Sequence, residues 1–149
     1  MRFLLCSIAM VAAIIAAPSV STADSGMLVG KWRGSYSCLQ GHTGLQLTFG
    51  EGDEAAIAGE FAFFPLQDNP DVPTGRFAVS ATYNERSRGV AVKGVRWIKQ
   101  PTNYRMVDLT GTLSEDGKHI DGKVEFTGCT SFHVTREGGA RQSTKAKGS

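Results

Sequence analysis

This sequence lacks any large excess of charge of one sign. Its 149 residues carry 16 lysines and arginines against 14 aspartates and glutamates, for a formal charge of +2. A protein this close to neutral has no extended field with which to hold nucleic acid or an anionic membrane surface. We therefore expect neither to be its main partner.

Familiar catalytic and cofactor motifs are also missing. The chain has no G-x-x-x-x-G-K phosphate loop and no serine in a G-x-S-x-G context. The acidic stretch 51–54 is shorter than a calcium-binding loop and is typical of a charged turn. These absences predict a protein that is not an enzyme and that has no catalytic residues, metal site or cofactor.

Cysteine is scarce, and its placement is informative. Residues 1–23 are typical of a signal peptide, with Arg2, an apolar run over 3–17, and a cleavage site after Ala23. The run is short for a membrane span and no second run follows it, so we expect no span in the mature chain. Cys6 leaves with the signal, and the remaining chain is expected to be secreted or periplasmic.

The two cysteines that remain, Cys38 and Cys129, lie near the two ends of the mature chain. An even number of cysteines in an oxidising compartment predicts a disulfide bond. Only strand-type sequence lies between them, so the bond is expected to join the first strand to the last. A closed ring of about 90 residues makes such a bond strongly stabilising.

A helical hydrophobic period is absent, whereas alternation with period two recurs along the whole chain. Short connections between about eight such segments are typical of an antiparallel meander that closes into a barrel or sandwich. We predict one all-β, barrel-like domain over 24–136, followed by a disordered tail over 137–149. The predicted strands are 31–38, 45–49, 57–63, 76–83, 90–97, 107–113, 120–126 and 132–134.

Turn chemistry defines one hairpin. Asp116-Gly117 is typical of a two-residue turn, because these residues tolerate the positive φ that such turns require. The register that follows pairs Gly111 with Gly122, which leaves room for large rings from other strands. In the fifth strand the alternation slips near 93–94, which predicts a β-bulge.

The last hairpin is predicted with 128–130 as a three-residue loop, so that Glu125 lies opposite His133. In this register His119 and His133 are several residues apart. A two-histidine metal site would need a different register. We therefore predict a solvent-facing pair of Glu125 and His133.

Large aromatic residues recur at alternating positions of the predicted strands. One interpretation is that they fill the core, and the other is that some of them line a cavity for one small molecule, as in small ligand-binding barrels. The ring candidates are Trp32, Phe61, Phe63, Phe77 and Trp97.

Two connections are longer than tight turns. Residues 65–74 contain three of the five prolines and are expected to be stiff, and residues 98–104 follow Trp97 with several polar side chains. Polar groups on a rigid rim beside aromatic rings suit ligand binding, although both segments can also be read as plain connections. A third segment, 40–44, links the first two strands. The predicted ligand-binding residues are Asp68, Asn69, Trp97, Lys99, Gln100, Asn103 and Tyr104.

Several strings in the chain resemble a small exported bacterial domain that occurs alone or appended to larger secreted or peptidase-like proteins. The resemblance covers about 30–136 and implies bacterial export, and it brings no activity or catalytic residue with it. The strings are G-K-W-R-G-S-Y-S-C-L-Q-G-H-T-G-L at 30–45, F-A-F-F-P at 61–65, N-P-D-V-P-T-G at 69–75, R-W-I-K-Q-P-T-N-Y at 96–104 and G-C-T-S-F-H-V-T-R at 128–136.

Two looser resemblances bear on function. The G-x-W opening and the eight-strand meander resemble avidin- and lipocalin-type barrels, which implies ligand binding. The Y-x-C opening resembles the bacterial inhibitors of C-type lysozyme, which implies action on another protein. Both are likenesses of fold, and a fold hosts many functions.

The leading hypothesis from the sequence is an exported, non-enzymatic binding module. Its target is a small ligand, a glycan or an extracytoplasmic protein, recognised through a barrel mouth or rim. The alternative is a protein inhibitor or host-interaction factor, for example one directed at a lysozyme or a protease. A third hypothesis is an enzyme that uses His42 with nearby carboxylates.

Overall fold

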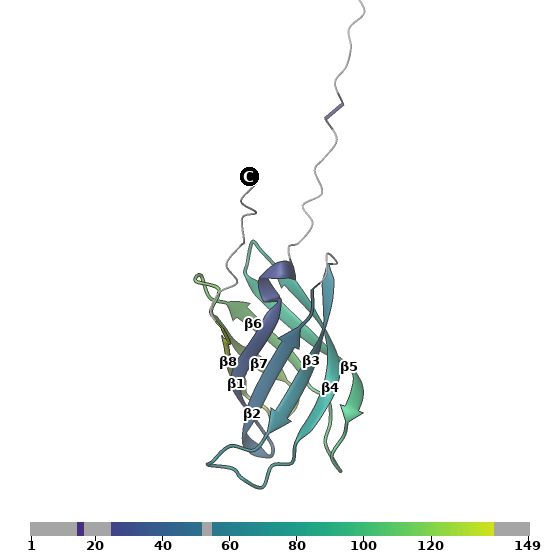
Figure 1. The fold of residues 1–149 in the computed structure, drawn as a ribbon, viewed down its shortest axis with the longest axis vertical. Helices are drawn as coiled ribbons and strands as arrows, with labels where there is room; N and C mark the ends of the chain where they lie inside the picture. Colours follow the sequence, from purple (N-terminus) through teal and green to yellow (C-terminus); the bar gives the residue numbers. More distant parts are fainter. Residues whose placement is uncertain (1–14, 17–24, 52–54, 139–149) are drawn as a thin grey trace, which may run out of the picture.

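The computed structural model describes residues 15–16, 25–51 and 55–138. The chain forms a closed antiparallel barrel of eight strands in sequence order, with β1 paired to both β2 and β8 (Figure 1). The predicted all-β fold is therefore confirmed. The predicted signal peptide and tail lie almost wholly outside the described residues. The elements are η1 Ser25–Leu28, β1 Gly30–Cys38, β2 Gly41–Phe49, β3 Ala56–Phe64, β4 Gly75–Asn84, β5 Gly89–Lys99, β6 Asp108–Leu113, β7 His119–Glu125 and β8 Ser131–Arg136.

The predicted disulfide is confirmed and lies at the seam of the barrel. Cys38 is the last residue of β1, and Cys129 lies in the connection just before β8. The same seam is closed by backbone pairing of β1 with β8, and Thr130 donates its N–H to the carbonyl of Ser37 at 3.0 Å. The bond therefore fastens together the two strands that convert the meander into a closed barrel.

The alternating side chains fill the inside of the barrel. Trp32, Phe61 and Phe77 are at most 1% exposed, so these rings are core residues. The glycine pair of β6 and β7 is confirmed, and a Cβ on Gly111 would lie only 2.9 Å from the ring of Phe132. The missing side chains thus make room for an inward ring, as the sequence predicts.

The predicted bulge in β5 is confirmed. Ala78 pairs with Arg96 while Val79 pairs with Gly94, so one extra residue, Val95, enters the strand. The pairing of β5 with β6 ends just before the bulge, since it covers only Gly89–Val92 of β5. The segment that connects these two strands lies beside the bulge, where Met106 is 3.1 Å from the position of a Cβ on Gly94.

The predicted register of the last hairpin is wrong. Asp121, and not Glu125, lies opposite His133, and Ile120 lies opposite Val134. The error is four residues, an even number, so the same side chains point inward in both registers and the apolar pattern does not separate them. The connection over 126–130 is longer than the predicted three-residue loop. It is held to β1 by the disulfide and by the hydrogen bond from Thr130 to Ser37.

One end of the barrel is closed by the N-terminal segment. Leu28 of η1 is fully buried, and its carbonyl accepts a hydrogen bond from the Trp32 indole N–H at 2.9 Å. The Arg136 guanidinium lies over the same indole, 4.1 Å from the ring centroid, and donates to the carbonyl of Val29 at 2.7 Å. These contacts cover that end of the barrel, so an opening toward the barrel interior has to be sought at the other.

Candidate functional site

The four connections at the open end are those that follow β1, β3, β5 and β7. In a barrel whose strands run alternately up and down, every second connection lies at the same end. The segments at this end are 39–40, 65–74, 100–107 and 126–130. Both connections that the sequence singles out therefore lie on one rim, opposite η1 (Figure 1).

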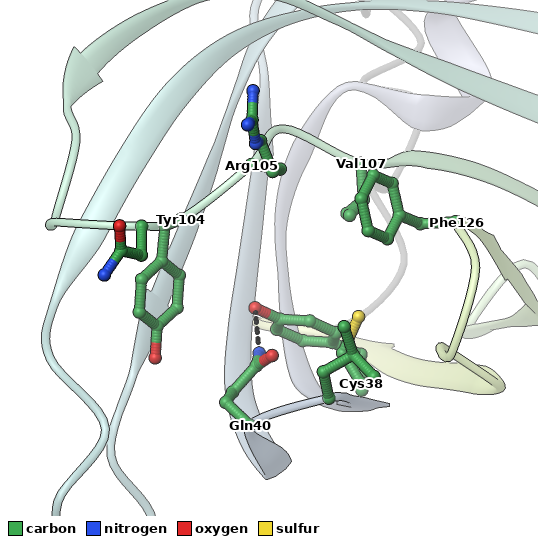
Figure 2. A pocket seen from close by; sticks show the side chains of 9 residues that line it. Cys38, Gln40, Tyr104, Arg105, Val107 and Phe126 are labelled. Atoms are coloured by element: carbon green, nitrogen blue, oxygen red, sulfur yellow. Dashed lines mark hydrogen bonds between the residues drawn. The ribbon is translucent and has the colours of Figure 1, made fainter.

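A cavity of about 270 Å³ opens at this rim (Figure 2). Its volume is just below the range for small-molecule sites, about 300–1,000 Å³. Leu39, Val107 and Phe126 give it an apolar side, whereas Gln40 and Arg105 bring polar groups. The lining residues are Tyr36, Cys38, Leu39, Gln40, Asn103, Tyr104, Arg105, Val107 and Phe126.

A chain of aromatic rings supports the cavity from inside the barrel. Tyr104 stacks on Phe63, with ring centroids 5.1 Å apart and planes 7° from parallel. Tyr36 meets Phe61 edge to face at 5.4 Å. The series continues between them through Phe77 and Trp97, so both tyrosines rest on packed rings. The lining is therefore held in place and the cavity is shallow, because the core rings fill the space behind it.

Tyr36 supplies a buried hydroxyl at the inner side of the cavity. Gln40 donates its side-chain N–H to the Tyr36 hydroxyl oxygen at 2.9 Å (Figure 2). Burial raises the pKa of Tyr36, nearby Tyr104 raises it further, and the Gln40 hydrogen bond opposes this in part. The phenol thus stays neutral at ordinary pH and its proton can be donated to a ligand.

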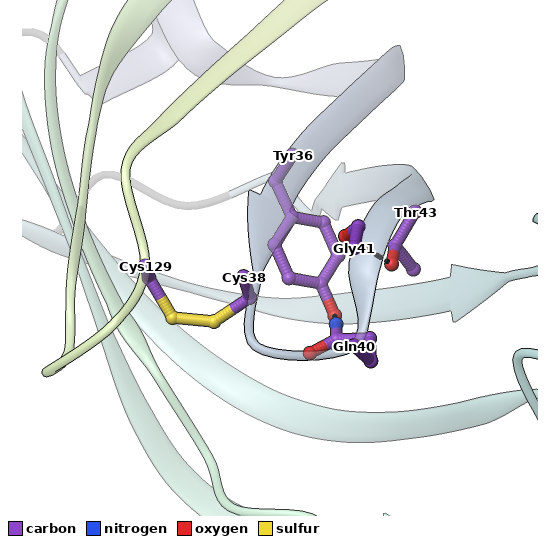
Figure 3. The surroundings of a disulfide bond; sticks show 6 residues. All are labelled: Tyr36, Cys38, Gln40, Gly41, Thr43 and Cys129. Atoms are coloured by element: carbon purple, nitrogen blue, oxygen red, sulfur yellow. Dashed lines mark hydrogen bonds between the residues drawn. A yellow bond between two sulfur atoms is a disulfide. The ribbon is translucent and has the colours of Figure 1, made fainter.

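The loop 65–74 is braced against the β1–β2 turn. The Asn69 side-chain N–H group donates to the carbonyls of Gln40 at 2.7 Å and His42 at 3.0 Å, and Asp68 pairs with the His42 ring at 2.7 Å. Gly41 makes the close approach possible, since its φ is +91° and Asn69 lies 3.0 Å from where a Cβ would stand. Figure 3 shows this turn next to the disulfide. The hydrogen bond from His42 lowers the pKa of Asp68.

The structure separates the predicted ligand-binding residues into three groups. Asn103 and Tyr104 line the cavity, and Trp97 lies behind it against Phe77. Asp68 and Asn69 brace the rim, as described above. Two further residues are engaged on the outside. Lys99 donates to the Thr74 hydroxyl at 2.7 Å, and Gln100 donates to the Tyr104 carbonyl at 3.1 Å.

Sequence reasoning missed most of the lining. Tyr36, Gln40, Arg105 and Phe126 come from three different connections or strand ends. One signal was present, because the Cys38–Cys129 bond places the residues around 36–40 next to those around 126–129. Arg105 carried no comparable signal, since its position depends on how the β5–β6 connection crosses the mouth.

Comparisons with known proteins give no family for this chain. No family model, no curated protein and no solved structure matches it. Within the described residues no helix has the length and apolar character needed to cross a membrane. In the same part of the chain no cluster of three or more histidine, cysteine, aspartate or glutamate side chains is placed to hold a metal ion.

The raised pKa of Tyr36 gives a prediction about alkaline stability. The folded-state pKa lies above the ordinary value of 10.0, so the stabilisation is complete below pH 10 and is lost as the pH rises beyond it. The free energy of unfolding should fall by about 1.4 kcal/mol between pH 9 and 11 through this group alone. Urea unfolding at several pH values measures the loss, and Tyr36→Phe should show a smaller one. Equal slopes for the two proteins would contradict the assignment.

Proposed function

We propose that the protein is an exported binding module that takes one small molecule into the cavity at the open end of its barrel. The observation that carries the proposal is the meeting of polar groups and an apolar wall in one cavity, two of whose lining residues are held by the Gln40–Tyr36 hydrogen bond and the stacking of Tyr104 on Phe63. Preformed concave sites with a few convergent polar groups are the usual form of small-molecule sites. A binding role also agrees with the absence of catalytic motifs in the sequence.

The chemistry of the lining indicates the kind of ligand. Leu39, Val107 and Phe126 favour an apolar edge or ring, and Gln40 with the Tyr36 hydroxyl favours a hydrogen-bonding group on its opposite side. Arg105 is exposed at the rim and adds a positive charge. The best fit is a ring-sized molecule that has a carboxylate or another acceptor, or a single sugar unit of a glycan. A long acyl chain does not suit so shallow a cavity.

Two substitutions of basic residues test the site, one at the end of β5 and one in the connection that follows it. Arg105→Gln removes a charge at the edge of the cavity. Lys99→Gln removes an equal charge outside the cavity, where the ammonium is hydrogen-bonded to the Thr74 hydroxyl. A charge-assisted hydrogen bond contributes about 1.5–3 kcal/mol, so Arg105→Gln should weaken binding of a small carboxylate about tenfold or more. Lys99→Gln should stay within about twofold.

The probes are a panel of aromatic carboxylates and monosaccharides, measured by calorimetry with purified protein. Equal weakening in both variants would mean that the charges act only at long range. Full affinity in Arg105→Gln for every carboxylate that binds would place the ligand elsewhere.

A second candidate function rests on the apolar rim. Leu39 is 76% exposed and Phe126 is 40% exposed, and both stand beside the cavity mouth. Exposed apolar side chains on a rigid rim favour insertion into a partner protein, as an inhibitor of a lysozyme or protease would require. Inhibition of such an enzyme that Leu39→Asp abolishes, with carboxylate binding retained, would favour this function over the first.

A further inference from the structure

Two histidines meet on the outer wall of the barrel, away from the mouth cavity. The rings of His119 and His133 have centroids 5.6 Å apart and planes within 24° of parallel. His119 is the first residue of β7, and His133 lies on the neighbouring strand β8 (Figure 1). About half of the His133 side chain is open to solvent, so an ion can reach it.

The β7–β8 register brings these rings together. His119 lies opposite Thr135, and Asp121 lies opposite His133. The two histidines are therefore diagonal neighbours on one face of an antiparallel pair, a distance that large side chains can bridge. Ile120 and Val134 alternate with them and point into the core, so the outward direction of the histidines is fixed by the barrel itself.

The hydrogen bonds around the pair aim two ring nitrogens at one point. Asp121 accepts from Nδ1 of His133, which leaves the lone pair of a neutral ring on Nε2. That Nε2 lies 3.4 Å from the hydroxyl oxygen of Thr135, and Nδ1 of His119 lies 3.2 Å from the same oxygen. Two imidazole nitrogens thus converge on one hydroxyl group.

We propose that His119 and His133 form a surface site for a divalent transition-metal ion, with the Thr135 hydroxyl beside it. Imidazole nitrogen is a preferred ligand of copper, nickel and zinc. Metal-binding histidines usually give their second N–H to a carboxylate, and Asp121 stands in that position behind His133. Metal–nitrogen bonds are about 2.0–2.1 Å long, so both rings have to turn toward one ion and exchange their contacts of 3.2 and 3.4 Å with the Thr135 hydroxyl for bonds to the metal.

The proposed site is open and exchangeable. It has two protein nitrogens and one hydroxyl, and water completes the coordination, which separates it from the closed four-ligand sites of structural zinc. The described residues contain no cluster of three or more histidine, cysteine, aspartate or glutamate side chains that could hold a metal ion. The proposed site is of a simpler kind, because only two such side chains bind the ion directly. Among divalent ions of the first transition row, Cu²⁺ should bind most tightly. The inference does not depend on the proposed ligand site at the mouth.

The test is a titration of the untagged protein with Cu²⁺, followed by electron paramagnetic resonance and competition with a chelator of known affinity. We expect one ion per chain with two nitrogen ligands. His119→Ala and His133→Ala should each weaken binding at least tenfold, because each removes one of the two donors. Asp121→Asn should weaken it about tenfold, since loss of the carboxylate behind a ligating histidine costs 10–100-fold.

His42→Ala is the matched control. His42 is also an exposed histidine that is paired with a carboxylate, Asp68, and it lines the same outer-wall pocket as His133, but it lies on β2 and does not belong to the His119–His133 ring pair. The control should bind Cu²⁺ as the native protein does. Absence of stoichiometric binding, unchanged affinity in both His119→Ala and His133→Ala, or a loss caused by His42→Ala would each overturn the proposal.

Discussion

Removing the Cys38–Cys129 disulfide should lower the free energy of unfolding by about 4.5 kcal/mol. The two cysteines are 91 residues apart in sequence, and the loss of chain entropy in the unfolded state grows with the length of the closed loop. Small domains have a total stability of about 5–15 kcal/mol, so this one bond decides whether the barrel stays folded under mild stress. Urea unfolding of the double variant Cys38→Ser, Cys129→Ser against the oxidised native protein measures the effect.

The double variant also provides a control for the reducing agent. Dithiothreitol should destabilise the native protein to the level of the double variant and should leave the variant itself unchanged. A loss below about 1 kcal/mol would mean that the β1–β8 pairing closes the barrel without help from the bond. A loss of that small size would contradict our account of the seam.

The second large effect is expected at the closed end of the barrel. Trp32→Ala should destabilise the protein by about 3–5 kcal/mol, the usual cost of removing a fully buried large aromatic side chain. The change also leaves the Leu28 carbonyl without its indole donor and removes the surface on which the Arg136 guanidinium rests. Both losses loosen η1 from the end that it seals.

Trp32→Phe is the graded control for this prediction. It keeps a ring in the core and lacks the indole N–H, so its loss should be smaller than that of Trp32→Ala. Urea unfolding of the three proteins gives the order, and hydrogen exchange at Val29 and Gly30 reports on the sealed end. Equal stability of Trp32→Ala and the native protein would show that the indole does not hold this end closed.

The fold could be predicted from the sequence because strands and tight turns are marked by residues that are close together in the chain. Period-two alternation placed the strands, and the Asp116-Gly117 turn predicted the pairing of Gly111 with Gly122 that the structure has. The disulfide followed from the count and position of the cysteines. The predicted register of the last hairpin was wrong by an even number of residues, which leaves the same side chains facing inward. In the structure, residues 129–130 are held to β1 by the disulfide and by a backbone hydrogen bond.

The candidate site followed from the sequence only in part. The two rim connections and the lining residues Asn103 and Tyr104 were predicted from composition, because prolines and polar groups mark such segments. Tyr36 and Phe126 were read as ordinary strand residues. Their place at the cavity depends on barrel closure, which brings together residues that are far apart in sequence. The meeting of His119 with His133 depends on the register of β7 and β8, which the predicted hairpin missed by four residues.

The central claim is that the mouth cavity binds a small molecule, and nuclear magnetic resonance with isotope-labelled protein tests it most directly. Aromatic carboxylates and monosaccharides are added in turn to the oxidised protein, and the backbone amide shifts are followed. Our account predicts saturable shifts that gather on 36–40, 103–107 and 126–129, and Arg105→Gln should reduce them for carboxylates. Saturable shifts that gather elsewhere on the barrel, or no saturable shift with any compound of either class, would contradict it.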